Sequence, residues 1–218
     1  MERIGKGIST ADSIDSYIER FYDDAGIVKA GKMLIAHFIL QAEKDSVLNI
    51  DYVDQKFELD MHSLAGNWMM KYAKILFSRI KNPDDLVDRV NVINFNYDRC
   101  LERFLIEAIR QGYEIPEEHA WEIVYSMRIV HPYGTLGKLP KHALASSQPG
   151  IIPFGGDSWS IDEIAEGINT YTEEVTDAGR VDDISKIIKS AASAVFLGFA
   201  FHSQNVDLLK RKNDGSLR

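Results

Sequence analysis

The sequence predicts an α/β fold, with a parallel sheet flanked by helices and a helical subdomain in the N-terminal third. Helical patterning fills most of the chain up to residue 85, and after residue 90 short apolar runs alternate with further helical segments. This alternation is typical of a parallel sheet, because a crossover between parallel strands needs a helix-length connection. We expect one domain over residues 1–218, with a mainly helical layer at 12–85 and an α/β core at 86–218.

The first third of the chain is expected to be helical. Residues 14–24 repeat apolar side chains at helical spacing, and the segment 26–44 is apolar nearly all round, which predicts a buried helix. A further helix is predicted over 63–81, where the Asn-Pro pair ending at Pro83 stops it. The mixed composition of 49–61 is compatible with a loop or a short helix.

The run Val90–Asp98, which reads VNVINFNYD, predicts the first strand and the place of a site. Its apolar residues are nearly continuous, as in a strand buried on both faces, and residues 99–109 then repeat at helical spacing. The strand ends in Asn94, Asn96 and Asp98. Polar groups at the carboxyl end of a central strand, beside a helix start, mark the usual ligand-binding edge of an open α/β sheet.

Two further strands are expected at 126–130 and 194–199, and each ends in a loop with polar residues and glycine. Residues 151–154 are expected to form a short strand or a loop that lines the site. Helical periodicity also predicts helices at 161–172, 182–192 and 204–210.

The bulk composition excludes several classes of protein. The net charge is −8, which argues against a general nucleic-acid binder because a phosphate backbone needs a basic surface. There is no run of 18 apolar residues, so no membrane span is predicted. The start of the chain lacks the charged and apolar regions of a secretory signal. We therefore expect a cytoplasmic protein that acts away from membranes.

Cys100 is the only cysteine, so the chain cannot form an internal disulfide or a four-cysteine zinc site. Two interpretations of Cys100 stay open, a nucleophile just after a strand and a small core residue, of which the second is the commoner role. No metal site is expected, because the spacing of the remaining histidines does not fit a ligand set. These histidines are His37, His62, His119, His142 and His202.

Three loops at the ends of the predicted strands carry a resemblance to a known family. They read NFNYD at 94–98, HPYGTLG at 131–137 and GFAFHSQN at 198–205, and a helix near the start begins SIDSYI at 13–18. In order and spacing they resemble the sirtuin-like domains of bacteria, which are NAD-binding relatives of the protein deacylases. The resemblance covers most of the chain and implies a Rossmann-like parallel sheet with NAD as substrate or ligand.

The resemblance also implies roles for eight residues. Asn96 matches the amide that orients a water beside the nicotinamide ribose, where bond cleavage passes through a cationic sugar. His131 is the candidate general base. The positions implied to bind the cofactor are Asp98, Tyr133, Gly134, Gly198, Phe199 and Asn205, with Ser203 as an alternative to Asn205. The implied activity is hydrolysis of NAD to nicotinamide and ADP-ribose in defence against phage. No zinc is expected. The chain is expected to act as a homo-oligomer or together with additional defence proteins.

Departures from the family pattern favour a second hypothesis, an inactive nucleotide-binding sensor, interaction module or truncated remnant. Tyr133 stands where the family has its catalytic histidine, and a tyrosine hydroxyl titrates near ~10. Ser203 stands where an acid is expected, and Gly5–Ser9 resembles the phosphate loop only superficially, without a strand before it. Simpler roles also stay open, with Asp98 as a helix cap and His131 as a loop histidine bonded to the backbone. A third hypothesis is a hydrolase of another nucleotide.

Overall fold

The computed structural model describes residues 2–11, 14–49, 59–141, 150–156, 161–170, 173 and 178–210. The described residues form a mixed α/β structure with far more helix than strand. In chain order the elements are α1 (Glu2–Gly7), η1 (Ile8–Thr10), α2 (Ile14–Glu19), α3 (Ala25–Lys44), α4 (Trp68–Arg79), α5 (Asp85–Arg89), β1 (Asn91–Ile93), α6 (Cys100–Gly112), α7 (Glu117–Ser126), β2 (Arg128–Val130), α8 (Ile161–Glu166), α9 (Ala178–Ser190) and α10 (Ser203–Leu209).

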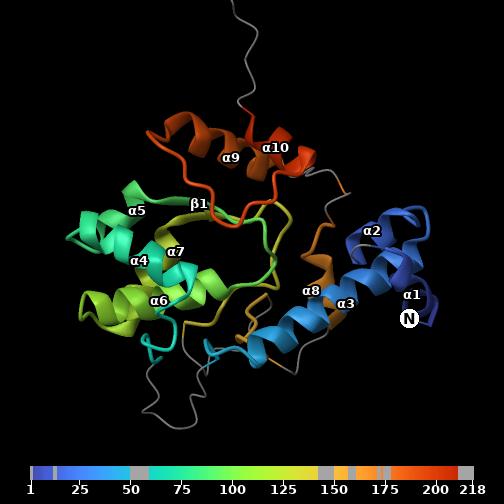
Figure 1. Cartoon of the computed structure of the whole chain (residues 1–218), viewed down its shortest axis with the longest axis horizontal. Coiled ribbons are helices and arrows are strands. Elements are labelled where there is room, and N and C mark those ends of the chain that lie inside the picture. Colours follow the sequence, from blue (N-terminus) through green and yellow to red (C-terminus); the bar gives the residue numbers. More distant parts are fainter. Residues whose placement is uncertain are drawn as a thin grey trace, which may run out of the picture.

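The helices form three groups around the small sheet (Figure 1). One group holds α4, α5, α6 and α7, a second holds α1, α2, α3 and α8, and α9 with α10 lies at the top of the view beside the sheet. Contacts along the chain agree with this grouping, since α6 packs on α7 and α4, α3 packs on α8 and α2, and α10 packs on α9. The helices of the N-terminal third therefore divide between two groups, each completed by helices from later in the chain.

The described strands form a two-stranded parallel sheet. Asn91 pairs with Arg128, and Ile93 pairs with Val130 at the other end of the register. The amide of Asn94 extends the ladder by donating to the Val130 carbonyl at 2.8 Å. Both helices α6 and α7 lie between the strands in sequence, which is the crossover that a parallel pair requires. As a result, the loops that follow β1 and β2 leave the sheet at the same edge.

The prediction of a third strand at 194–199 is wrong. These residues form an irregular connection between α9 and α10, and the side chains of Val195, Phe196 and Leu197 are exposed. Apolar and β-branched residues favour a strand only where a neighbouring strand pairs with their backbone. Among the described residues the sheet consists of β1 and β2 only, so no strand pairs with this segment.

Smaller differences concern the ends of elements and have local causes. α4 begins at Trp68 rather than near residue 63, because the Asn67 side chain caps it by accepting a hydrogen bond from the Met69 amide. Residues 151–154 form a loop that meets Lys138 through one bridge at Ile151. Gly5–Ser9 spans α1 and η1, so it does not form the strand-following loop that a phosphate site needs.

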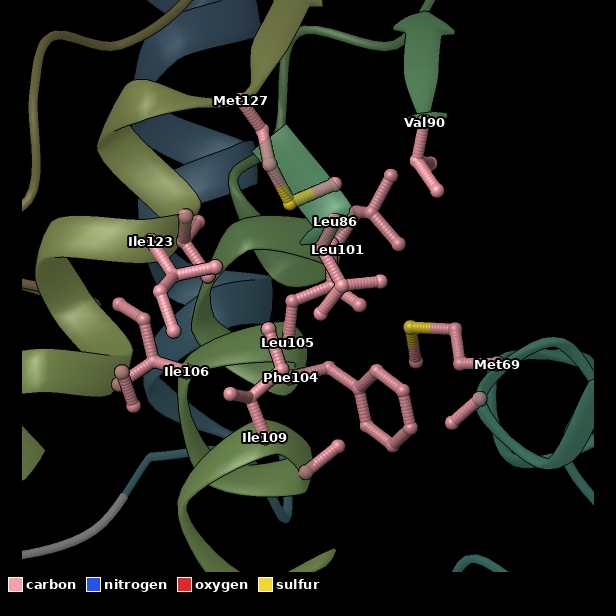
Figure 2. Close-up of a cluster of buried hydrophobic side chains, with 14 of the residues drawn as sticks. Met69, Leu86, Val90, Leu101, Phe104, Leu105, Ile106, Ile109, Ile123 and Met127 are labelled. Atoms are coloured by element: carbon pink, nitrogen blue, oxygen red, sulfur yellow. The ribbon is translucent and has the colours of Figure 1, made fainter. Parts of the chain in front are cut away.

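The largest core lies between α4, α6 and α7 (Figure 2). α6 occupies its centre, where Phe104 and Leu105 are fully buried. Met69 of α4 faces Phe104, and Ile123 of α7 lies on the other side of the helix. Because α6 is held on both sides, its first turn, which follows the β1 loop directly, has a fixed position.

Helix α3 is long and apolar enough to cross a membrane by length and composition alone, with 20 residues and a mean hydropathy of 1.2. Core helices of globular domains meet the same criterion. In this chain Ile35 and Leu40 of α3 belong to a core shared with Ile164 and Ile168, and Glu43 at its end is buried. However, 28% of the apolar window is buried and Phe38 is 64% exposed, so the expectation of a buried helix over 26–44 is wrong for most of its length. α3 packs against the domain through the residues named above.

Candidate functional site

The loops after β1 and β2 and the connection before α10 converge at one edge of the sheet. The Asn96 carbonyl lies 2.8 Å from Nδ1 of His131, and the Tyr133 hydroxyl donates to Oδ1 of Asn205 at 2.7 Å. The Phe95 ring joins these loops, with centroid distances of 6.1 Å to Tyr133 and 5.1 Å to Phe199. We call this group the edge cluster, formed by Phe95, Asn96, His131, Tyr133, Phe199 and Asn205.

His131 is bonded through both ring nitrogens. Nδ1 meets the Asn96 carbonyl and Nε2 meets Oε1 of Glu102, each at 2.8 Å. A carbonyl accepts only, so Nδ1 carries a proton and donates it to the Asn96 carbonyl. Nε2 shares its proton with a carboxylate from the first turn of α6. In this arrangement His131 holds the β1 loop against β2 and α6, and it offers a substrate no free basic nitrogen.

The surroundings of His131 shift its titration. Burial of the ring, the largest single influence, lowers the pKa of His131, but the hydrogen bond and charge of Glu102 and the Asn96 carbonyl outweigh it. The net effect raises the pKa of His131 above its ordinary value. The imidazolium form is therefore stabilised by folding, which suits a positioning role and opposes a general base, since a base must accept a proton.

This shift predicts a dependence of stability on pH. A raised folded-state pKa means that His131 contributes stability below its unfolded pKa of about 6.5, and that this contribution is lost as the pH rises through the folded value. An NMR titration of the His131 ring should give a pKa above that of an unfolded peptide. In a Glu102→Gln variant the pKa should fall, because burial then acts without the carboxylate. An unchanged pKa in that variant would contradict the assigned pairing.

Asp98 and Tyr97 have structural partners. Oδ1 of Asp98 accepts a hydrogen bond from the Cys100 amide at 3.0 Å, which closes a turn just before α6, whose N-cap residue is Arg99. The Tyr97 hydroxyl donates to the Asn169 carbonyl at 2.8 Å, and the Asn169 amide donates to the Tyr133 carbonyl at 2.9 Å. These bonds fix the β1 loop to the β2 loop through the chain that follows α8.

The two predicted glycines of the site differ. Gly134 has a φ of +83°, and a Cβ placed on it would lie 1.9 Å from the Gly167 carbonyl oxygen, so glycine is required there for close packing of two backbone segments. Gly198 has a φ of +61° with open space around it. It is exposed beside Phe199 of the edge cluster. The space beside the Gly198 backbone is therefore open to a ligand, whereas the space beside Gly134 is filled by the Gly167 backbone.

Cys100 is half-buried at the start of α6. Burial, followed by the charge and hydrogen bond of Asp98, raises the pKa of the Cys100 thiol far above its ordinary value. A thiol that stays protonated is a poor nucleophile, so the geometry supports the interpretation of Cys100 as a small packing residue.

Metal-binding groups of three or more histidine, cysteine or carboxylate side chains are absent from the described residues. His142 lies outside the described residues, as does Ser13 of the predicted SIDSYI start. A cavity of about 100 Å³ lies elsewhere, between α6, α7 and the loops at 139–141 and 153–154. Its cations are paired within the protein, Arg103 with Glu107 and Lys141 with Glu118.

Sequence reasoning missed Phe95 of the edge cluster and three residues that lie beside the cluster. Glu102 pairs with His131, Asn169 bonds the Tyr133 backbone, and Nη1 of Arg180 would lie 3.6 Å from a Cβ on Gly134. Only Glu102 had a usable signal, because it lies in the first turn of α6, next to the β1 loop, where a carboxylate is favoured by the helix dipole. Comparisons with protein-family models, curated proteins and solved structures gave no match.

Proposed function

We propose that this chain is a sirtuin-like domain that binds NAD at the edge cluster. The supporting observation is the convergence of the loop at Asn96, the loop at Tyr133 and the first turns of α10 at Asn205. Ligands of open α/β folds bind at this edge of the sheet. Asn96 is exposed and Asn205 is half-buried, so amide groups border the surface where a ribose would lie.

In the catalytic form of this proposal, the chain hydrolyses NAD to nicotinamide and ADP-ribose, in the cytoplasm and in defence against phage. Asn96 orients the attacking water. His131 then acts through its hold on the Asn96 carbonyl, as a positioning residue rather than as a base. Cleavage that proceeds through a cationic sugar needs little help from a base at the start, because charge develops mainly on the ribose.

A second candidate function is binding without cleavage, as a sensor or interaction module. It is favoured by the bonds that occupy the polar groups of the edge cluster. His131 uses both ring nitrogens within the protein, and the Tyr133 hydroxyl donates to Asn205. Neither group is placed to move a proton to or from a substrate.

The test combines calorimetry with an assay of nicotinamide release from NAD. The catalytic form predicts binding and turnover, with turnover reduced about 100-fold or more in Asn96→Ala. Asn91→Ala is the matched control, because Asn91 is an exposed asparagine at the opposite end of β1. Binding without nicotinamide release would establish the second candidate. Failure of the purified protein to bind NAD would contradict both forms.

A further inference from the structure

The connection between α9 and α10 exposes an unusual concentration of apolar side chains. Four of the nine large hydrophobic residues that the described structure leaves exposed lie within residues 195–201. Single exposed hydrophobic residues are normal, but a contiguous group marks a binding surface. Phe196 is 51% exposed and Phe201 is 61% exposed, so ring surface is available to a ligand.

Three aromatic rings of this connection form one surface, which we call the aromatic platform and define as Phe196, Phe199 and Phe201. The Phe199 and Phe201 rings meet edge to face, with centroids 4.8 Å apart and an interplanar angle of 84°. Phe196 lies 5.4 Å from Phe199 and 5.3 Å from Phe201. Each ring is supported by the other two, so the platform has a defined shape although two of its members are exposed.

Phe201 also has a backbone conformation that bulky residues avoid. Its φ is +51°, in the left-handed region, where a side chain with a Cβ costs energy. Among the described residues only Glu114 shares this feature without being glycine. Strain of this kind is concentrated at functional positions, where it sets the direction of a side chain. Here it holds an exposed aromatic ring beside the predicted ligand edge.

The aromatic platform is continuous with the edge cluster. Phe199 belongs to both groups and lies 5.1 Å from Phe95, which in turn contacts Tyr133. The side-chain oxygen of Asn205 accepts a hydrogen bond from the Tyr133 hydroxyl, and these polar groups lie next to the aromatic rings. One surface therefore offers aromatic faces next to hydrogen-bonding groups, which is the combination that a nucleotide needs for its base and its sugar.

We propose that the aromatic platform stacks against the heteroaromatic base of a nucleotide whose sugar lies at the edge cluster. The inference rests on the proposed function and adds the part of the ligand that this surface recognises. Every base has an aromatic face, and stacking on phenylalanine contributes substantially to binding. The net charge of −8 disfavours a polynucleotide, so the ligand is a small nucleotide. Adenine and nicotinamide share this chemistry, and the test separates them.

The experiment measures binding by calorimetry with four probes: NAD, AMP, nicotinamide mononucleotide and ribose 5-phosphate. We expect NAD and one of the two mononucleotides to bind more tightly than ribose 5-phosphate, which has no base. In Phe201→Ala and Phe196→Ala that affinity should fall by about tenfold or more, whereas Phe201→Trp should retain it. Phe38→Ala is the matched control, because Phe38 is 64% exposed on α3, away from the edge cluster.

The outcomes separate this inference from the proposed function. If NAD binds and the two alanine variants bind it equally well, the aromatic platform is refuted and NAD binding stands. If AMP binds in a Phe201-dependent manner and NAD does not, the platform stands and the proposed function fails. Binding of no probe overturns both. A loss of self-association in Phe201→Ala, with nucleotide affinity unchanged, would assign the surface to contact between copies and would also refute the platform.

Discussion

Replacing Glu43 by glutamine is expected to lower the free energy of unfolding by about 3–5 kcal/mol, because it leaves a buried arginine unpaired. Glu43 is 1% exposed and Arg99 is 2% exposed. Oε1 of Glu43 accepts hydrogen bonds from both Nε and the backbone amide of Arg99, each at 3.1 Å, and Oε2 accepts the Gly155 amide at 3.1 Å. The Arg99 guanidinium also donates to the Pro153 carbonyl. One carboxylate thus joins α3, the start of α6 and the loop at 151–155.

Urea denaturation followed by circular dichroism measures this loss. The matched control is Glu122→Gln, which breaks an ion pair with Lys141 whose side chains are 56% and 30% exposed. An exposed pair contributes about 0–1 kcal/mol, so the control should change little. If Glu43→Gln cost no more than the control, the buried pair would not be the fixed point that orients the β1 loop and α6.

The second large effect is expected for Gly134→Ala, with a loss of about 3 kcal/mol in the free energy of unfolding. A left-handed conformation costs a residue with a Cβ roughly 1–2 kcal/mol, and forced overpacking costs about 1–3 kcal/mol more. Both terms apply, because φ at Gly134 is +83° and the new Cβ would lie 1.9 Å from the Gly167 carbonyl oxygen. That oxygen belongs to backbone, so it cannot move aside as a flexible side chain would.

Gly198→Ala is the control for the steric term. Gly198 also has a positive φ, at +61°, but a Cβ there meets open space. Only the conformational cost of roughly 1–2 kcal/mol remains. Thermal and urea unfolding of both variants should therefore show a clearly larger loss for Gly134→Ala. Equal losses would contradict the close approach of the Gly134 and Gly167 backbones.

Local patterns in the sequence predicted the elements that form by themselves. The strand at Asn91–Ile93 and the helix from Cys100 were predicted, because an apolar run and a helical repeat can be read from adjacent residues. The expectation that this strand is buried on both faces is wrong, since Asn91 is exposed and Val92 and Ile93 are half-buried in a two-stranded sheet. The α/β class is confirmed at this coarse level, with a two-stranded parallel sheet. The Rossmann-like arrangement stays a prediction. The strand at 194–199 failed because pairing depends on neighbours that a local pattern does not contain.

The candidate site could be predicted in position but not in its internal bonds. The rule that strand ends share one edge brought Asn96 and His131 together, and they are in contact. The same rule cannot show that His131 is held by Glu102, or that Arg99 meets Glu43, which is 56 residues away in the chain. Such pairs join residues that are far apart in the chain and belong to no shared sequence pattern, so only the folded structure reveals them. They decide which polar groups stay available for a ligand.

The most direct test of the central claim is an NMR titration of the ¹⁵N-labelled protein with NAD. Convergence of the edge cluster on one ligand predicts that the amide signals of Asn96, Tyr133, Phe199 and Asn205 shift together and fit a single dissociation constant. Shifts confined to another part of the molecule, or no shifts at millimolar NAD, would contradict the assignment of the edge cluster as a dinucleotide site.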